Sequence, residues 1–199
     1  MIVALSSEAV PHATHDDLVE GAARRGLTAL HLVFENAGAL ASVSARSDVS
    51  IVGISVKSIE GLAPEAAADA ALRLHAPFVV PAIGASWRRA FERRGAALIG
   101  DYEMNAAREN VAAAFATVLA TGAHVQHITL RGGGPEAVHH EGCGIGSLMA
   151  RLAVSAYQGA LVLAPSSRAA LPLWRAWLQQ GRNWGCGSKQ QDPSLVQLG

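Results

Sequence analysis

Short apolar runs alternate with helix-like stretches about seven times along this chain, and this alternation restricts the fold more than any other feature. Runs typical of buried strands lie at 2–5, 27–34, 50–56, 77–83, 96–102, 124–130 and 160–164. Helical patterns separate most of them, such as the stretch that opens at Pro64 and the stretch 86–95 that Gly95 closes. Such alternation is typical of a mostly parallel sheet with helices outside it.

Two α/β architectures satisfy this pattern. One is a TIM-type (β/α) barrel, whose functional loops follow the strands. The other is an open, doubly wound sheet with its site where the strand order reverses. A full barrel needs eight units and ~250 residues, and this chain has 199 residues. A barrel would therefore be incomplete, with about seven units over residues 1–181, followed by an irregular tail at 182–199.

The charge balance indicates which partners to expect. Sixteen basic and sixteen acidic residues give a formal net charge of zero, so we expect neither nucleic acid nor an anionic membrane as a partner. No apolar run reaches the ~20 residues of a membrane span. The chain has two cysteines, far apart, and starts directly with a strand. These features predict a cytoplasmic protein.

Three polar residues stand on late predicted strands. Asp101 and Glu103 are two positions apart, so both side chains face the same side of a strand. His127 stands in the alternating strand 124–130, and its side chain is expected to face the barrel interior. Carboxylates and imidazole can move protons or bind metal ions, so these three residues are candidate catalytic residues.

Four further residues are candidates for binding a substrate. Arg131 opens the glycine-rich segment RGGGPEAVHHEGCGIG, where backbone N–H groups and the guanidinium could bind an anion or a sugar. His140 belongs to the polar cluster in the same segment. His12 lies in the first loop, and His31 lies in the middle of the strand 27–34. In a parallel barrel, the loops that hold Arg131, His140 and His12 meet at one end.

The order of these motifs resembles the xylose isomerase-like barrel superfamily, the sugar-phosphate isomerase and epimerase group. The segments that carry the resemblance are IVALSS, GDYEMN, His127, EGCGIG, LMARLAVSAYQG and LVLAPSS. The resemblance implies a TIM barrel that acts on a sugar or a phosphorylated sugar, with a divalent Mn, Mg, Co or Zn ion. It assigns Asp101 and His127 as metal ligands and Asp101, Glu103 and His127 as the residues that carry the reaction.

The chain departs from this family at ligand positions. The family has a glutamate before Pro165, where this chain has Ala164, and another glutamate where this chain has His31. Two hypotheses follow: a sugar isomerase or epimerase with a degenerate metal site, or a non-catalytic relative that binds a small polyol or anion or serves as a partner subunit. A barrel that lacks one unit would also leave a strand edge open, which a second copy of the chain could cover.

Overall fold

The computed structural model describes residues 2–9, 14–24, 28–42, 49–105, 125–132 and 157–165. The elements are β1 (Ile2–Ser6), the short 3-10 helix η1 (Ser7–Ala9), α1 (His15–Arg24), β2 (Ala29–Phe34), α2 (Ala37–Ser42), β3 (Ser50–Val56), α3 (Pro64–Arg73), β4 (Phe78–Val80), α4 (Ala85–Arg94), β5 (Leu98–Asn105), β6 (His127–Gly132) and β7 (Ala160–Pro165). The predicted tail at 182–199 lies outside this part of the chain.

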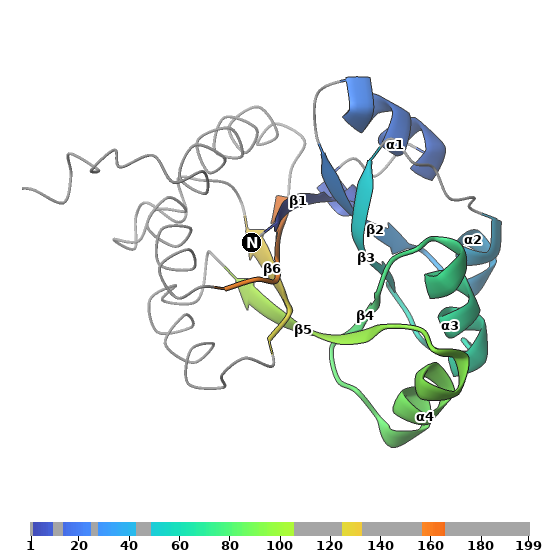
Figure 1. Cartoon of the computed structure of the whole chain (residues 1–199). Helices are drawn as coiled ribbons and strands as arrows, with labels where there is room; N and C mark the ends of the chain where they lie inside the picture. The colour runs from blue at the N-terminus through green and yellow to red at the C-terminus, as the bar shows by residue number, and fades with distance from the viewer. Residues whose placement is uncertain are drawn as a thin grey trace, which may run out of the picture.

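The seven strands form a closed parallel barrel in chain order. Strand β1 pairs with β7 through four registered residues, from Ile2 opposite Ala160 to Leu5 opposite Leu163. The prediction of an α/β barrel is therefore confirmed, and the open sheet is not formed. The expected open strand edge is wrong, because the first and last strands bond directly to each other. Figure 1 shows α1 to α4 outside the barrel, along the side formed by the early strands.

Local sequence explains where the helices begin and end. Thr14 and Asp17 form a reciprocal capping box at α1: Asp17 N–H donates to Thr14 Oγ1 (3.1 Å), and Thr14 N–H donates to Asp17 Oδ2 (3.3 Å). Pro64 occupies the first turn of α3, as predicted. Gly95 ends α4 in the left-handed conformation (φ 66°), which glycine adopts without a steric penalty.

Strand β4 is the shortest of the seven. It covers three residues, and a single registered pair, Ile54 with Phe78, joins it to β3. Prolines at 77 and 81 flank it, and a proline has no N–H for the sheet ladder. The predicted strand 77–83 is therefore shortened at both ends.

The barrel wall separates two apolar layers. Alternate residues such as Leu32, Phe34 and Phe78 pack outward with the buried faces of α3 and α4. The layer inside the barrel is smaller and consists of Ala4, Ala29, Val52, Ala160 and Val162. Barrel diameter grows with strand number, and in this part of the barrel the interior side chains are alanine and valine. These residues fill the lower interior and leave polar residues nearer the carboxyl ends of the strands.

Within the described residues, no helix is both long enough and apolar enough to cross a membrane.

Candidate functional site

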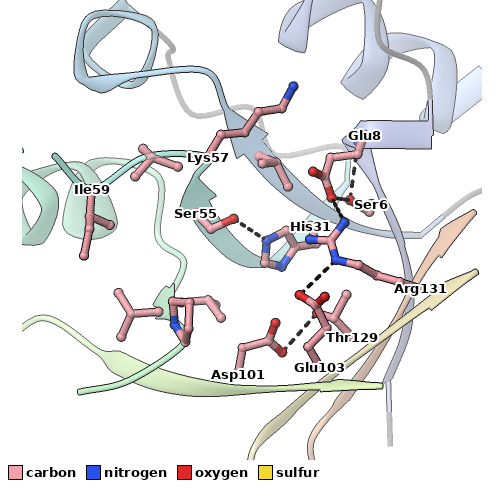
Figure 2. Close-up of a pocket in the computed structure, with 15 residues that line it drawn as sticks. Ser6, Glu8, His31, Ser55, Lys57, Ile59, Asp101, Glu103, Thr129 and Arg131 are labelled. Carbon is pink, nitrogen blue, oxygen red and sulfur yellow. Dashed lines mark hydrogen bonds and ion pairs between the residues drawn. The ribbon is translucent and has the colours of Figure 1, made fainter. Parts of the chain in front are cut away.

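Polar side chains from five strands meet where the strands approach their carboxyl ends. They line a pocket of about 260 Å³, with Ser6 and Glu8 on one side and Asp101 and Glu103 on another. Figure 2 shows His31 in the middle of the pocket, with Ser55 on a third side and Arg131 reaching in from β6. In parallel barrels this end carries the functional residues, so the pocket is the candidate site.

A chain of hydrogen bonds crosses the barrel interior below the pocket. Asp101 Oδ1 lies 2.8 Å from His127 Nδ1. His127 Nε2 lies 2.9 Å from His31 Nδ1, and His31 Nε2 lies 2.9 Å from Ser55 Oγ. Both imidazole rings are buried: His127 is fully inaccessible, and His31 is 4% exposed. The chain thus connects a carboxylate on β5 with a hydroxyl group on β3.

One set of bond directions is consistent with an ionised Asp101 and two neutral imidazole rings. Asp101 then accepts from His127 Nδ1, and His127 Nε2 keeps a lone pair. That lone pair accepts from His31 Nδ1, which leaves His31 Nε2 to accept from the Ser55 hydroxyl. Thr129 Oγ1 also donates to Asp101 Oδ1 (3.0 Å) and holds the carboxylate in place.

Burial keeps His31 neutral. Burial and, to a smaller extent, the neighbouring His127 together lower the pKa of His31 from 6.5 to about 3. The charge of Asp101 acts in the opposite direction and does not compensate. His31 therefore acts as a neutral donor and acceptor at physiological pH.

The two histidines meet because Gly53 has no side chain. A Cβ atom at Gly53 would lie 3.0 Å from His31 Nδ1, 3.2 Å from His127 Nε2 and 2.8 Å from Val79 Cγ2. The register between β2 and β3 also shifts at Leu30/His31, so that His31 pairs with Gly53. A β-bulge of this kind re-aims a side chain. Glycine and bulge together make room for the His31–His127 contact.

A second polar group lies at the mouth of the pocket. Arg131 Nη1 contacts Glu8 Oε2 at 2.5 Å, and Arg131 Nε contacts Glu103 Oε2 at 2.9 Å. Glu8 N–H donates in turn to Ser6 Oγ (3.3 Å). Figure 2 shows the guanidinium of Arg131 between the two carboxylates. The positive charge of Arg131 is thus compensated twice within the protein.

The structure brings together most of the residues that the sequence singled out. Hydrogen bonds join Asp101, His127 and His31 in series, and His127 faces the barrel interior as predicted. Glu103 shares a strand with Asp101 but contacts Arg131 instead of the histidines. Arg131 reaches the pocket. His12 and His140 lie outside the residues that the structure describes.

Sequence reasoning missed four residues of this site: Ser6, Glu8, Ser55 and Thr129. Ser55 and Gly53 alternate in the strand SIVGISV, and a serine in an otherwise apolar strand was a usable signal. Glu8 follows the first strand in a loop longer than a simple connection needs, which is where functional residues often lie. Their contacts depend on strands far apart in sequence, so spacing alone does not reveal them.

The residues that the resemblance assigns to a divalent metal do not fit a cation in this arrangement. Both ring nitrogens of His127 are engaged, one by Asp101 and one by His31. Asp101 Oδ1 already accepts from His127 and Thr129. Ala164, buried opposite Arg131, offers a methyl group where the family has a carboxylate. Within the described ranges, no three His, Cys, Asp or Glu side chains converge to hold a metal ion. We therefore derive no step through a metal.

A scan against protein-family models finds no match for this chain, and a search of curated proteins finds none either.

Proposed function

We propose that the barrel mouth binds a small neutral polyol, such as a sugar, and that the protein moves a proton on it as an isomerase or epimerase without a divalent cation. One observation carries this proposal: the residues that resemble metal ligands form a hydrogen-bonded chain, Asp101–His127–His31. A chain of this kind can accept a proton from a bound molecule, which is the role of a general base.

The proton has a defined destination. A substrate hydroxyl or an acidic C–H group that replaces the Ser55 hydroxyl as the partner of His31 Nε2 would give its proton to this nitrogen. His31 would pass its Nδ1 proton to His127 Nε2. The positive charge would then rest on His127, in contact with the Asp101 carboxylate. Such a partner stabilises an imidazolium far better than the apolar surroundings of His31 do.

The charges at the mouth support a neutral substrate over a phosphorylated one. Glu8 and Glu103 both contact Arg131, so this guanidinium has little attraction left for a phosphate. Lys57, the other cation in the lining, pairs with Glu35 at 2.6 Å. Carboxylates that point into a pocket accept hydrogen bonds from hydroxyl groups. The volume of about 260 Å³ suits a small molecule, since sites for drug-sized ligands start at ~300 Å³.

A second candidate function is binding without catalysis, as a polyol-binding protein or a partner subunit. The observation that favours it is the burial of the hydrogen-bonded histidines. His127 is inaccessible to solvent, and the low pKa of His31, about 3, makes its imidazole a weak base. In this reading the histidines fix the barrel interior, and the mouth only recognises hydroxyl groups.

Solvent exchange tests the proposal. Incubation in D₂O with a panel of unphosphorylated aldoses and ketoses should place deuterium at the carbon next to the carbonyl, detected by NMR. We expect the exchange to persist in EDTA and to fall by about 10²-fold or more in Asp101→Asn, since a positioned base typically contributes 10²–10⁴.

The controls separate the alternatives. Exchange that appears only after addition of Mn²⁺, Mg²⁺, Co²⁺ or Zn²⁺ would restore the metal-dependent mechanism. Saturable sugar binding without exchange would favour the non-catalytic function. Phosphorylated sugars in the same panel test whether the compensated Arg131 discriminates against anions.

A further inference from the structure

The hydrogen-bonded chain ends on the side chain of Ser55, and proton transfer on a polyol gives this residue no role of its own. Ser55 lies on β3, is half-buried and lines the pocket. Its hydroxyl lies 2.9 Å from His31 Nε2, an interaction drawn as a dashed line in Figure 2. With both imidazole rings neutral, this hydroxyl donates to His31 Nε2, so its oxygen lone pairs are left for another partner.

The arrangement has the three parts that activate a nucleophile: a hydroxyl, a base and a group that orients the base. Such contacts fall within ≈ 2.6–3.2 Å in nucleophilic enzymes. Here they measure 2.9 Å from Ser55 to His31, 2.9 Å from His31 to His127 and 2.8 Å from His127 to Asp101. Thr129 restrains Asp101 from the other side. The base is thus oriented through an additional imidazole.

Other hydroxyl groups in the pocket are placed differently. Ser6 Oγ accepts from the backbone of Glu8 and approaches its carboxylate. Thr129 donates to Asp101. Among the described residues of the pocket lining, Ser55 is the hydroxyl within hydrogen-bond distance of a histidine nitrogen. The pocket therefore has one hydroxyl with a base positioned to take its proton.

We propose that Ser55 is a nucleophile that takes the acyl group of a small ester, of which an O-acyl ester of a neutral polyol suits the pocket best. The choice of a polyol ester rests on the proposed function, because the compensated Arg131 disfavours anionic substrates. The acyl transfer itself goes beyond it and depends only on the chain from Ser55 to Asp101.

Each step balances. Ser55 Oγ attacks the ester carbonyl carbon and forms a C–O bond, while its proton passes to His31 Nε2 and the Nδ1 proton of His31 passes to His127 Nε2. The bond from the carbonyl carbon to the alcohol oxygen breaks, and the alcohol leaves with the proton returned through His31 Nε2. Water then attacks the acyl-serine by the same route, which releases the carboxylic acid and regenerates Ser55. The net reaction is ester plus water to acid plus alcohol.

The relay through two histidines suits the burial of His31. A positive charge on His31 would be unfavourable, since burial and His127 both hold its pKa low, at about 3. When His31 accepts at Nε2 and donates at Nδ1, it changes tautomer and stays neutral. The charge appears on His127, whose Nδ1 lies 2.8 Å from Asp101 Oδ1.

Acylation with p-nitrophenyl acetate tests the proposal. The full-length protein should release a burst of p-nitrophenol approaching one equivalent, and mass spectrometry of peptides should find one acetyl group on Ser55. We expect Ser55→Ala to lose the burst and Asp101→Asn to slow it by about 10²-fold or more. Ser50→Ala is the matched control, because Ser50 is exposed at the opposite end of the same strand, and it should retain the burst.

A measurement on the wild-type protein covers the case in which Ser55→Ala does not fold. A fluorophosphonate probe, followed by peptide mapping, should modify Ser55. Acetyl or phosphonyl groups found only on Lys57, on a cysteine or on no residue would overturn the proposal. A burst that Ser55→Ala retains would do so as well.

The two proposals can fail separately. Modified Ser55 without binding or exchange of any sugar would leave acyl transfer standing and remove the polyol substrate. Sugar exchange with an unreactive Ser55 would leave the isomerase proposal standing and remove the nucleophile.

Discussion

At the scale of single residues, the site depends on a glycine as much as on its polar groups. Gly53 leaves the space in which the rings of His31 and His127 meet, with centroids 4.8 Å apart. His31, His127 and Val79, which surround this space, are all buried, and buried side chains are closely packed. The contact between the histidines is therefore sensitive to a single methyl group.

Gly53→Ala should break this contact. Its Cβ would lie 2.8 Å from Val79 and 3.0 Å from His31, so the rings must move apart. We expect a loss of about 1–3 kcal/mol in the free energy of unfolding, the range for overpacked cores. Urea titration measures this loss, and NMR should show that the hydrogen-bonded imidazole N–H signals disappear.

Gly100→Ala is the control for that substitution. It also adds a methyl group to a glycine in a barrel strand, but the nearest heavy atom is Ile83 Cδ1 at 3.9 Å. The free energy of unfolding of Gly100→Ala should therefore differ little from that of the wild-type protein. Equal losses in both variants would show that the space at Gly53 is not needed for the histidine pair.

His31 should make the protein sensitive to acid. Its pKa is about 3 in the folded protein and 6.5 when exposed, so between these values the unfolded chain binds a proton that the folded protein does not. Stability should fall as the pH drops from 6.5 toward 3, by up to about 1.4 kcal/mol per pH unit from this residue. Above pH 6.5 the residue contributes no pH dependence.

Comparison with His31→Gln isolates this contribution, because glutamine keeps a donor and an acceptor and does not titrate. The difference in unfolding free energy between the two proteins, measured by urea denaturation from pH 7 to pH 4, should change along that slope. Parallel profiles would mean that His31 is accessible to protons in the folded state.

At the scale of elements, local sequence patterns predicted which segments form strands and helices, but they did not predict the register in which the strands pair. Pro64 predicted the start of α3 and Gly95 the end of α4, because a first-turn proline and a helix-ending glycine act within a few residues. The bulge that aligns His31 with Gly53 has no local signature. Ser55 was missed for the same reason: its partner lies on a neighbouring strand 24 residues away.

At the scale of the whole molecule, the closure of the barrel was the feature that length alone misjudged. Counting units against an eight-strand barrel predicted an open edge, yet β1 and β7 pair along four residues. The interior explains how seven strands suffice, since Ala4, Ala29 and Ala160 fill it with little volume. The position of alanines on interior faces was present in the sequence, but it becomes informative only once the strand register is known.

The closed barrel should therefore be destabilised by larger side chains in its interior. Ala4 is completely buried and pairs with Val162 across the β1–β7 seam. In Ala4→Leu the larger side chain has no space inside a seven-strand barrel, and we expect a loss of about 1–3 kcal/mol or more in unfolding free energy. Amide hydrogen exchange should rise first in β1 and β7, because the strain falls on their shared hydrogen bonds.

Leu5→Met is the control for Ala4→Leu. Leu5 faces the outer layer, and Leu5→Met conserves volume there, so its cost should stay below about 1.5 kcal/mol. Faster exchange spread evenly over all strands in Ala4→Leu would mean that the seam is no weaker than the rest of the barrel. No loss of stability would mean that the interior holds unused space, and the small residues would then not account for closure with seven strands.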